Sequence, residues 1–281
     1  MTAQPPGVSR DVEGERNFDG VSPMLSVQRE FTTGDLVYLL YSEGFRAGGF
    51  NTGGFLWPIR APRAQFKSDR LRNYELGAKA RLLDSRLSTR GAVFYNTWQN
   101  VQSEIYRPSG VAFTGNAGDA RVLGLEAEIA YEFDFGLSIQ ANGLLADTDM
   151  TRRNPEFSLT STLIDELPGV PRFSGGVLVV YERPIASGTT LRLAGETSYV
   201  GQSAVSFETA RAWSQGDYLR ARLSAELANE RWSASVFVNN PGNAAGDTFA
   251  YGNPFIYTLA NGRLVTPQRP RTLGVRLAAA F

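Results

Sequence analysis

The chain has 281 residues and a formal net charge of zero, with 28 Lys and Arg against 28 Asp and Glu. This balance gives no overall basic surface for nucleic acid, and the absence of Cys and His excludes disulfides, thiolate or imidazole metal sites and a Ser-His-Asp triad. No apolar run approaches the roughly 18 residues that a membrane-spanning helix needs. We therefore predict no metal site, no cofactor and no nucleic-acid partner.

Residues 1–22 are polar and acidic. They contain no basic segment followed by an apolar one, which is the pattern of a signal peptide. We expect them to be the remnant of an extracellular loop, and we expect the chain to be the C-terminal piece of a longer protein.

Alternation of apolar and polar residues predicts eleven strands, because successive side chains of a strand point to opposite faces. The predicted strands are 23–29, 35–42, 71–82, 86–105, 123–131, 137–145, 173–181, 191–199, 219–227, 232–238 and 272–281. Most are longer than the five or six residues that are typical of globular sheets. No helical period of any length is present.

Charged residues fall almost without exception on the polar parity of these strands. They are Glu75, Lys79, Arg81, Arg90, Glu126, Glu128, Arg192, Glu196, Arg220, Arg222, Glu226 and Arg276. A charge on the lipid face of a membrane barrel costs about 2–4 kcal/mol near the bilayer midplane, which would enforce this sorting. A soluble β-sandwich also keeps charges off its core face, so it remains the alternative at this point.

The connections between the predicted strands alternate in length. Short turns at 30–34, 83–85, 133–136, 184–188 and 229–230 alternate with long loops at 44–69, 107–117, 149–170, 202–215 and 241–268. Outer-membrane barrels have short periplasmic turns and long extracellular loops. Aromatic residues near strand ends suit interfacial girdles; they are Tyr95, Trp98, Tyr131, Tyr181, Tyr199 and Trp232. The pattern favours an all-β, transmembrane antiparallel barrel.

The segment from Tyr38 to Asn51 reads Y-L-L-Y-S-E-G-F-R-A-G-G-F-N and resembles the TonB-dependent outer-membrane receptors. The resemblance extends over about residues 20–281, through the segments 74–87, 92–102, 116–128 and 167–174 and the R-T-L-G-V-R-L end. It implies a barrel of about 22 strands with a plugged lumen, a known barrel class. Residues 23–281, with about 11 strands, would then be the C-terminal half of the barrel, and the plug domain has no counterpart here.

The resemblance also implies a function. We expect a non-enzymatic receptor in the outer membrane of a Gram-negative bacterium, taking up a scarce ligand such as an iron chelate, a vitamin or a glycan. Its expected partners are outer-membrane lipid, the barrel assembly machinery, an unknown small ligand, and the TonB energising complex acting through a plug. The alternative is a free-standing barrel of about 12 strands, either a passive pore or an autotransporter-type translocator.

Five residues near predicted outer strand ends are candidate ligand contacts: Arg46, Asn51, Trp98, Tyr106 and Arg107. Aromatic stacking and charge-assisted hydrogen bonds would serve that role, and loop packing or interface anchoring is the alternative for each. The C-terminal Phe281 resembles the terminal aromatic that barrels present to their assembly machinery.

Two further patterns have simpler interpretations. Glu126 and Glu128 share a face, which would suit acid–base chemistry, but lumen ion pairs with arginines explain them more simply. The glycines of residues 44–51 lack the spacing of a phosphate-binding loop and predict a bend between a strand and a loop.

Overall fold

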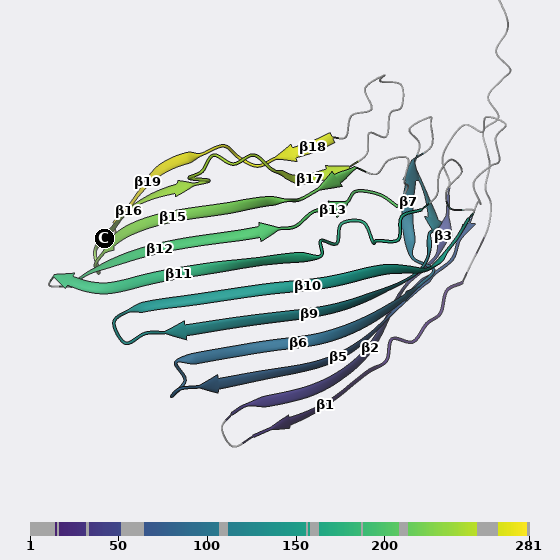
Figure 1. The fold of residues 1–281 in the computed structure, drawn as a ribbon, viewed down its shortest axis with the longest axis horizontal. Coiled ribbons are helices and arrows are strands. Elements are labelled where there is room, and N and C mark those ends of the chain that lie inside the picture. The colour runs from purple at the N-terminus through teal and green to yellow at the C-terminus, as the bar shows by residue number, and fades with distance from the viewer. Residues whose placement is uncertain are drawn as a thin grey trace, which may run out of the picture.

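The computed structural model describes residues 15, 17–31, 34–51, 65–106, 112–155, 157, 163–186, 188–207, 213–251 and 264–279. Eleven of its strands form one antiparallel sheet in chain order, as the alternation predicts (Figure 1). They are β1 (Met24–Glu30), β2 (Leu36–Arg46), β5 (Asp69–Leu82), β6 (Leu87–Gln99), β9 (Gly118–Glu132), β10 (Leu137–Arg153), β11 (Phe173–Ala186), β12 (Thr189–Val200), β15 (Tyr218–Ala228), β16 (Trp232–Asn239) and β19 (Thr272–Ala279).

Four small hairpins lie at the long connections, in predicted loops except for β7 (Gln102–Tyr106). They pair β3 (Gly49–Phe50) with β4 (Gln65–Phe66), β7 with β8 (Ala112–Asn116), β13 (Ser203–Ala204) with β14 (Ser214–Gln215), and β17 (Asp247–Tyr251) with β18 (Leu264–Pro267). The predicted single strand over 86–105 is wrong. Asn100 takes a left-handed conformation (φ 52°) that ends β6, so the residues after it form β7 in a separate hairpin.

The short turns all lie at one end of the sheet, and the long connections lie at the other (Figure 1). We call these the turn end and the mouth end. Left-handed residues close the turns, for example Gly136 (φ 89°) between β9 and β10. Several strands reach further into the mouth than predicted, since β2 continues to Arg46, β9 begins at Gly118 and β10 continues to Arg153. Because eleven strands alternate in direction, β1 and β19 both run toward the turn end.

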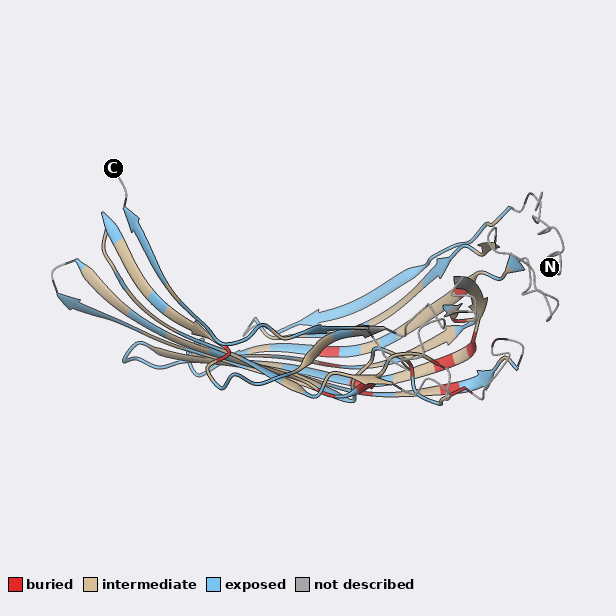
Figure 2. Cartoon of the chain, turned by 90° about the horizontal axis from the view of Figure 1, so that it is seen from above, coloured by how far each residue is buried: buried red, intermediate tan, exposed pale blue. Residues whose placement is uncertain are grey.

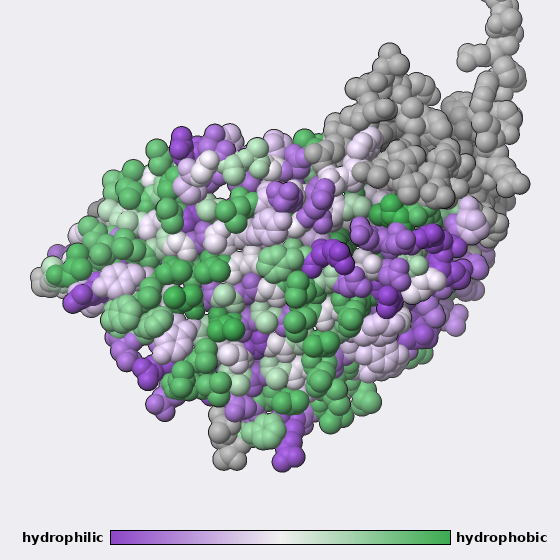
Figure 3. Space-filling model, viewed as in Figure 1, coloured by the Kyte–Doolittle hydropathy of each residue, from purple (hydrophilic) through white to green (hydrophobic). Residues whose placement is uncertain are grey.

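The two faces of the sheet differ in chemistry. On β9, Leu123, Leu125 and Ile129 are about half exposed, whereas Glu126 and Glu128 lie on the opposite parity. We call these sides the apolar face and the polar face. Figure 3 shows apolar residues spread over the middle of the sheet and hydrophilic ones gathered toward the mouth end. A soluble monomer rarely exposes so continuous an apolar surface.

Aromatic side chains border the apolar face at both ends. Near the mouth, the ring of Tyr74 lies 5.1 Å from that of Tyr41 and 6.4 Å from that of Tyr95. Near the turns, Phe133 lies 4.5 Å from Tyr131 and 5.3 Å from Phe135, measured between ring centroids. The predicted girdles are therefore present, except that Trp98 lies on the polar face, opposite Leu71 of β5.

The polar face carries aromatic rings that cover glycines of the neighbouring strand. Phe94 of β6 covers Gly124 of β9, and Tyr38 of β2 covers Gly77 of β5, so closely that a Cβ at either glycine would collide with the ring. These pairs fill the space that the missing side chain leaves in the strand.

The sheet is twisted and curved, and most of its buried residues lie toward the mouth end (Figure 2). Within the described ranges, no helix is long and apolar enough to cross a membrane.

Candidate functional site

The mouth ends of β2, β5 and β6 bring three polar-face residues together. Arg46, the last residue of β2, is the register partner of Asp69, the first residue of β5. Trp98 lies one strand further, opposite Leu71 of β5. Arg46 and Trp98 are two of the five predicted ligand contacts, and the alternation of the strands places both on the polar face.

Asp69 is the centre of this group and is only 3% exposed. It accepts hydrogen bonds from the Arg46 guanidinium, from Trp98 Nε1 at 3.0 Å and from the backbone N–H of Gln102 at 3.3 Å. The Arg46 guanidinium lies 5.3 Å from the centroid of the Trp98 ring, within cation–π range. The buried carboxylate thus fixes both predicted contacts, while the Arg46 side chain keeps 55% of its surface exposed.

Asp69 lies beyond Tyr74 on the mouth side, outside the apolar stretch of β5. Burial raises the pKa of its carboxyl, but the hydrogen bonds from Arg46, Trp98 and Gln102 favour the ionised form and together hold the pKa below its usual value. The carboxylate is therefore charged at neutral pH and forms a fixed anchor for the Arg46 cation.

Asn51 has a different role, since its side chain forms two hydrogen bonds with the backbone of a neighbouring hairpin. Its Nδ2 donates to the Thr114 carbonyl, and its Oδ1 accepts from the Thr114 N–H, both at 2.8 Å. Asn116 makes the matching link from β8, donating to the Lys67 carbonyl at 2.9 Å and accepting from the Lys67 N–H at 2.8 Å. These contacts tie the β3–β4 hairpin to the β7–β8 hairpin.

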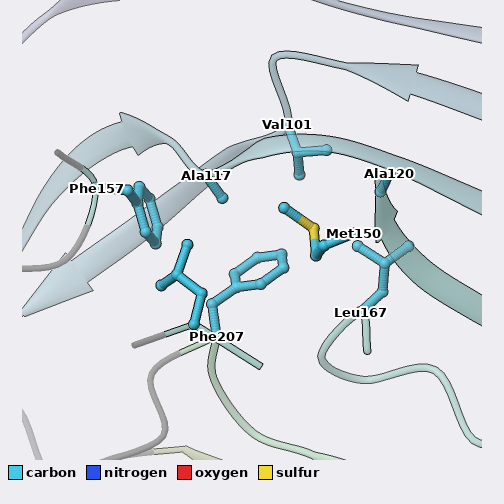
Figure 4. Close-up of a cluster of buried hydrophobic side chains, with 8 residues drawn as sticks. Val101, Ala117, Ala120, Met150, Phe157, Leu167 and Phe207 are labelled. Carbon is cyan, nitrogen blue, oxygen red and sulfur yellow. The ribbon is translucent and has the colours of Figure 1, made fainter. Parts of the chain in front are cut away.

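A small hydrophobic core lies at the same end of the sheet, where loops pack onto the polar face (Figure 4). Met150 of β10 meets Phe157 and Phe207 from the loops, and the two phenylalanine rings lie edge to face with centroids 5.9 Å apart. The remaining members are Val101, Ala117, Ala120, Leu163 and Leu167, with Trp98 packed against the cluster. Loop backbone completes it, because the Ile164 N–H donates to the Phe207 carbonyl at 2.8 Å.

The other predicted site residues stay predictions. Tyr106 ends β7, and nothing is described of its side chain; Arg107 and Phe281 lie outside the described residues. The sequence interpretation missed Asp69, Gln102 and Phe207. Asp69 could have been found from the sequence, because it is the acidic residue nearest to the mouth end of the strand that follows the Arg46 strand. Phe207 could not, because it lies in a loop without a periodic pattern.

A shallow depression of about 410 Å³ lies over β2, β5, β6 and β9, with Tyr38, Lys79, Arg90, Glu126 and Glu128 in its lining. Arg90 forms an ion pair with Glu128, which also accepts from Gln140 Nε2 at 2.8 Å. The Tyr38 hydroxyl donates to Glu75 at 2.6 Å. The ion pair supports the simpler interpretation of Glu128, a charge on the polar face balanced by an arginine.

The family model described as TonB dependent receptor-like, beta-barrel matches residues 3–240. The chain belongs to this family. It is therefore part of a receptor barrel of the outer membrane, in a family that is not enzymatic. The apolar face is the one expected to contact lipid in such a barrel.

Solved receptors share the fold. The ferric yersiniabactin uptake receptor FyuA from Yersinia pestis is 23% identical, with a TM-score of 0.69 over 90% of this chain and 36% of that one. The siderophore receptor PiuA from Acinetobacter baumannii is 18% identical, with a TM-score of 0.66 over 91% and 35%. The ferripyoverdine receptor of Pseudomonas aeruginosa is 20% identical, with a TM-score of 0.60 over 91% and 32%. The chain thus spans about a third of the length of these receptors. A comparison with curated proteins finds no match.

Proposed function

We propose that this chain is the C-terminal barrel part of a receptor that takes up an iron chelate across the outer membrane, with energy supplied through TonB. The match of residues 3–240 to the receptor barrel family carries the proposal. The choice of an iron chelate over a vitamin or a glycan is supported by the solved structures of similar fold. They are named as a ferric yersiniabactin uptake receptor, a siderophore receptor and a ferripyoverdine receptor.

The strand arithmetic supports a barrel completed by further strands. β1 and β19 run in the same direction, so pairing them directly would make one parallel ladder in an otherwise antiparallel sheet. A free-standing bacterial barrel has an even number of strands. The alternative of a small pore of about 12 strands therefore needs a strand that the described residues do not contain. We propose that further strands pair with β1 and β19 and that a plug fills the lumen and contacts TonB. We also propose that residues 1–22 belong to an extracellular loop and that the barrel part of the chain begins at residue 23.

In this proposal the mouth end supplies the surface that captures the ligand. Arg46 offers a half-exposed guanidinium on the polar face, fixed by Asp69 and by the Trp98 ring. A fixed cation can donate charge-assisted hydrogen bonds to the oxygens of an anionic chelate. We assign Arg46 to ligand contact, Trp98 and Asn51 to positioning, and keep Tyr106 and Arg107 as candidate contacts. Phe281 is proposed as the residue that the barrel assembly machinery recognises.

The test is transport in a strain that lacks the receptor and is complemented with the full-length protein. Binding and uptake are measured for labelled ferric catecholates and hydroxamates, cobalamin and maltodextrins, with and without functional TonB. Arg46→Gln is compared with Arg231→Gln, which removes an equal charge at the turn end. Heat-modifiable gel mobility confirms that each variant assembles.

We expect TonB-dependent uptake of one class of ferric chelate, with binding weakened about tenfold by Arg46→Gln and unchanged by Arg231→Gln. Uptake of cobalamin or maltodextrin alone would overturn the ligand class. Passage of small polar solutes without TonB would overturn the receptor itself and favour the passive pore.

A further inference from the structure

Toward the mouth, the apolar face carries a group of charges that departs from the sorting along the middle of the strands. Arg70 and Arg72 share the parity of Tyr74, and Arg121 shares the parity of Leu123, so their side chains leave the sheet on the lipid side. Arg172, just before β11, joins them through Asp147 of β10. We call Arg70, Arg72, Arg121 and Arg172 the outer arginine belt.

The belt lies on the mouth side of the Tyr41–Tyr74–Tyr95 row, which marks the border of the apolar stretch. Long loops face the outside of the cell in this class of barrel, so the belt is at the level of the outer-leaflet headgroups. Four cations share three carboxylates: Glu43 pairs with Arg70 and Arg72, Asp149 with Arg121, and Asp147 with Arg172. One positive charge is left in excess.

Among the described residues, the belt arginines use few of their donors. Arg70, Arg72 and Arg121 each donate one hydrogen bond there, at 3.2 Å, and the Arg172–Asp147 pair is 3.5 Å apart. Their side chains are between 31% and 81% exposed. Each guanidinium has five N–H donors in a planar fork that suits phosphate oxygens. Exposed ion pairs of this kind contribute little to folding stability.

An apolar groove leads away from the belt toward the middle of the sheet. It has a volume of about 410 Å³ and is lined by Val93, Leu123, Leu125 and Leu145, with Asp147 and Arg172 also in its lining. The four aliphatic side chains belong to the apolar face of β6, β9 and β10. Along this face a hydrocarbon chain finds apolar contact, and at the Arg172 end of the groove an anionic headgroup finds a guanidinium.

We propose that the outer arginine belt and this groove bind a phosphorylated lipid of the outer leaflet. An acyl chain lies in the groove against Leu123 and Leu145, and phosphate oxygens accept hydrogen bonds from Arg172 and Arg121. Apolar side chains and guanidinium groups follow one another along the strands. A lipid can contact both, whereas a free anion can contact only the guanidinium groups. The site lies on the outside of the barrel and is independent of the ligand captured at the mouth.

The test uses the assembled receptor purified from outer membranes, exchanged into nanodiscs of phosphatidylcholine with or without a minor fraction of phosphatidic acid, and measures retained lipid by native mass spectrometry. Arg121→Gln with Arg172→Gln removes the cations, and Leu123→Trp fills the groove. The matched control is Arg220→Gln with Arg222→Gln, which removes the same charge from the polar face. An additional arm adds inorganic phosphate.

We expect retained phosphatidic acid to fall about tenfold or more in the double belt variant and in Leu123→Trp, to be unchanged in the control, and to resist inorganic phosphate. Equal retention in the wild type and both variants would overturn the site. Loss in the control to the same extent would mean non-specific charge attraction, and displacement by inorganic phosphate would mean an anion site; either result contradicts the proposal. If the double belt variant fails to assemble, the retention of phosphatidic acid by Leu123→Trp alone tests the proposal.

Discussion

The two ends of the sheet differ in how they are held together. At the mouth end, Val101, Phe157 and Phe207 are between 2% and 6% exposed, and Asp69 is buried among donors. At the turn end, the described residues around the turns of β5–β6, β9–β10 and β15–β16 include no buried side chain. Phe135 in the β9–β10 turn is 60% exposed and Trp232 at the start of β16 is 41% exposed.

This difference shows which parts of the barrel the chain organises by itself. The turn end is held together by backbone hydrogen bonds between strands and by tight turns. Its side chains would be covered only by lipid on the apolar face and by other parts of the protein on the polar face. The mouth end has its own small core, which fixes the loops before any ligand arrives. A preorganised mouth lowers the ordering cost of ligand capture.

The largest expected effect comes from emptying that core. Phe207→Ala should weaken local stability of the mouth by about 3–5 kcal/mol, since a buried phenylalanine leaves a cavity. The measurement is hydrogen exchange of the Met150, Ile164 and Gly169 amides, which bond to loop carbonyls around the cluster. Phe135→Ala is the matched control and should leave these amides unchanged. Equal exchange in wild type and Phe207→Ala would show that the cluster does not hold the loops.

A smaller effect is expected at the buried carboxylate. Asp69→Asn removes the charge that Arg46 and the two N–H donors share, at an expected cost of about 1–3 kcal/mol. Asp134→Asn breaks the 2.8 Å ion pair with Arg86 at the turn end, where the carboxylate is 83% exposed, and should change nothing measurable. The measurement is the protease sensitivity of the mouth loops in the assembled receptor, which should rise in Asp69→Asn and stay unchanged in Asp134→Asn. Similar sensitivity in the two variants would remove the contrast between the ends.

The sequence allowed most of the sheet to be predicted, because a membrane-facing strand must alternate strictly. The strand around Leu123–Tyr131 and the turns on either side follow from that constraint alone. The mouth was less accessible to prediction. Arg46 and Trp98 were found because they lie near the outer ends of predicted strands. Their shared partner Asp69 depends on register between strands, and the hairpin after Asn100 depends on one left-handed residue. Phe157 and Phe207 meet through loop packing that leaves no periodic pattern.

The smallest effect concerns pH. The pKa of Asp69 in the folded protein lies below its unfolded value. Its contribution to stability is therefore complete above the unfolded pKa of about 3.9 and is lost as the pH falls through the folded value. Acidification below about pH 4 should release the Trp98 indole from Asp69, seen as a shift in its fluorescence against a Trp98→Phe reference. In Asp69→Asn this transition should vanish, and its persistence would assign the transition to another group.

The central claim is that one face of the sheet contacts lipid and the other does not. The chain has no cysteine, so single cysteines introduced at positions 122–130 of β9 can each carry a spin label without background. In the assembled receptor, collision with apolar oxygen should peak at positions 123, 125, 127 and 129, and collision with a water-soluble nickel chelate should follow the opposite parity or stay low. Accessibility to the nickel chelate at Leu123, Leu125 and Ile129, or a profile without a period of two, would contradict the membrane barrel.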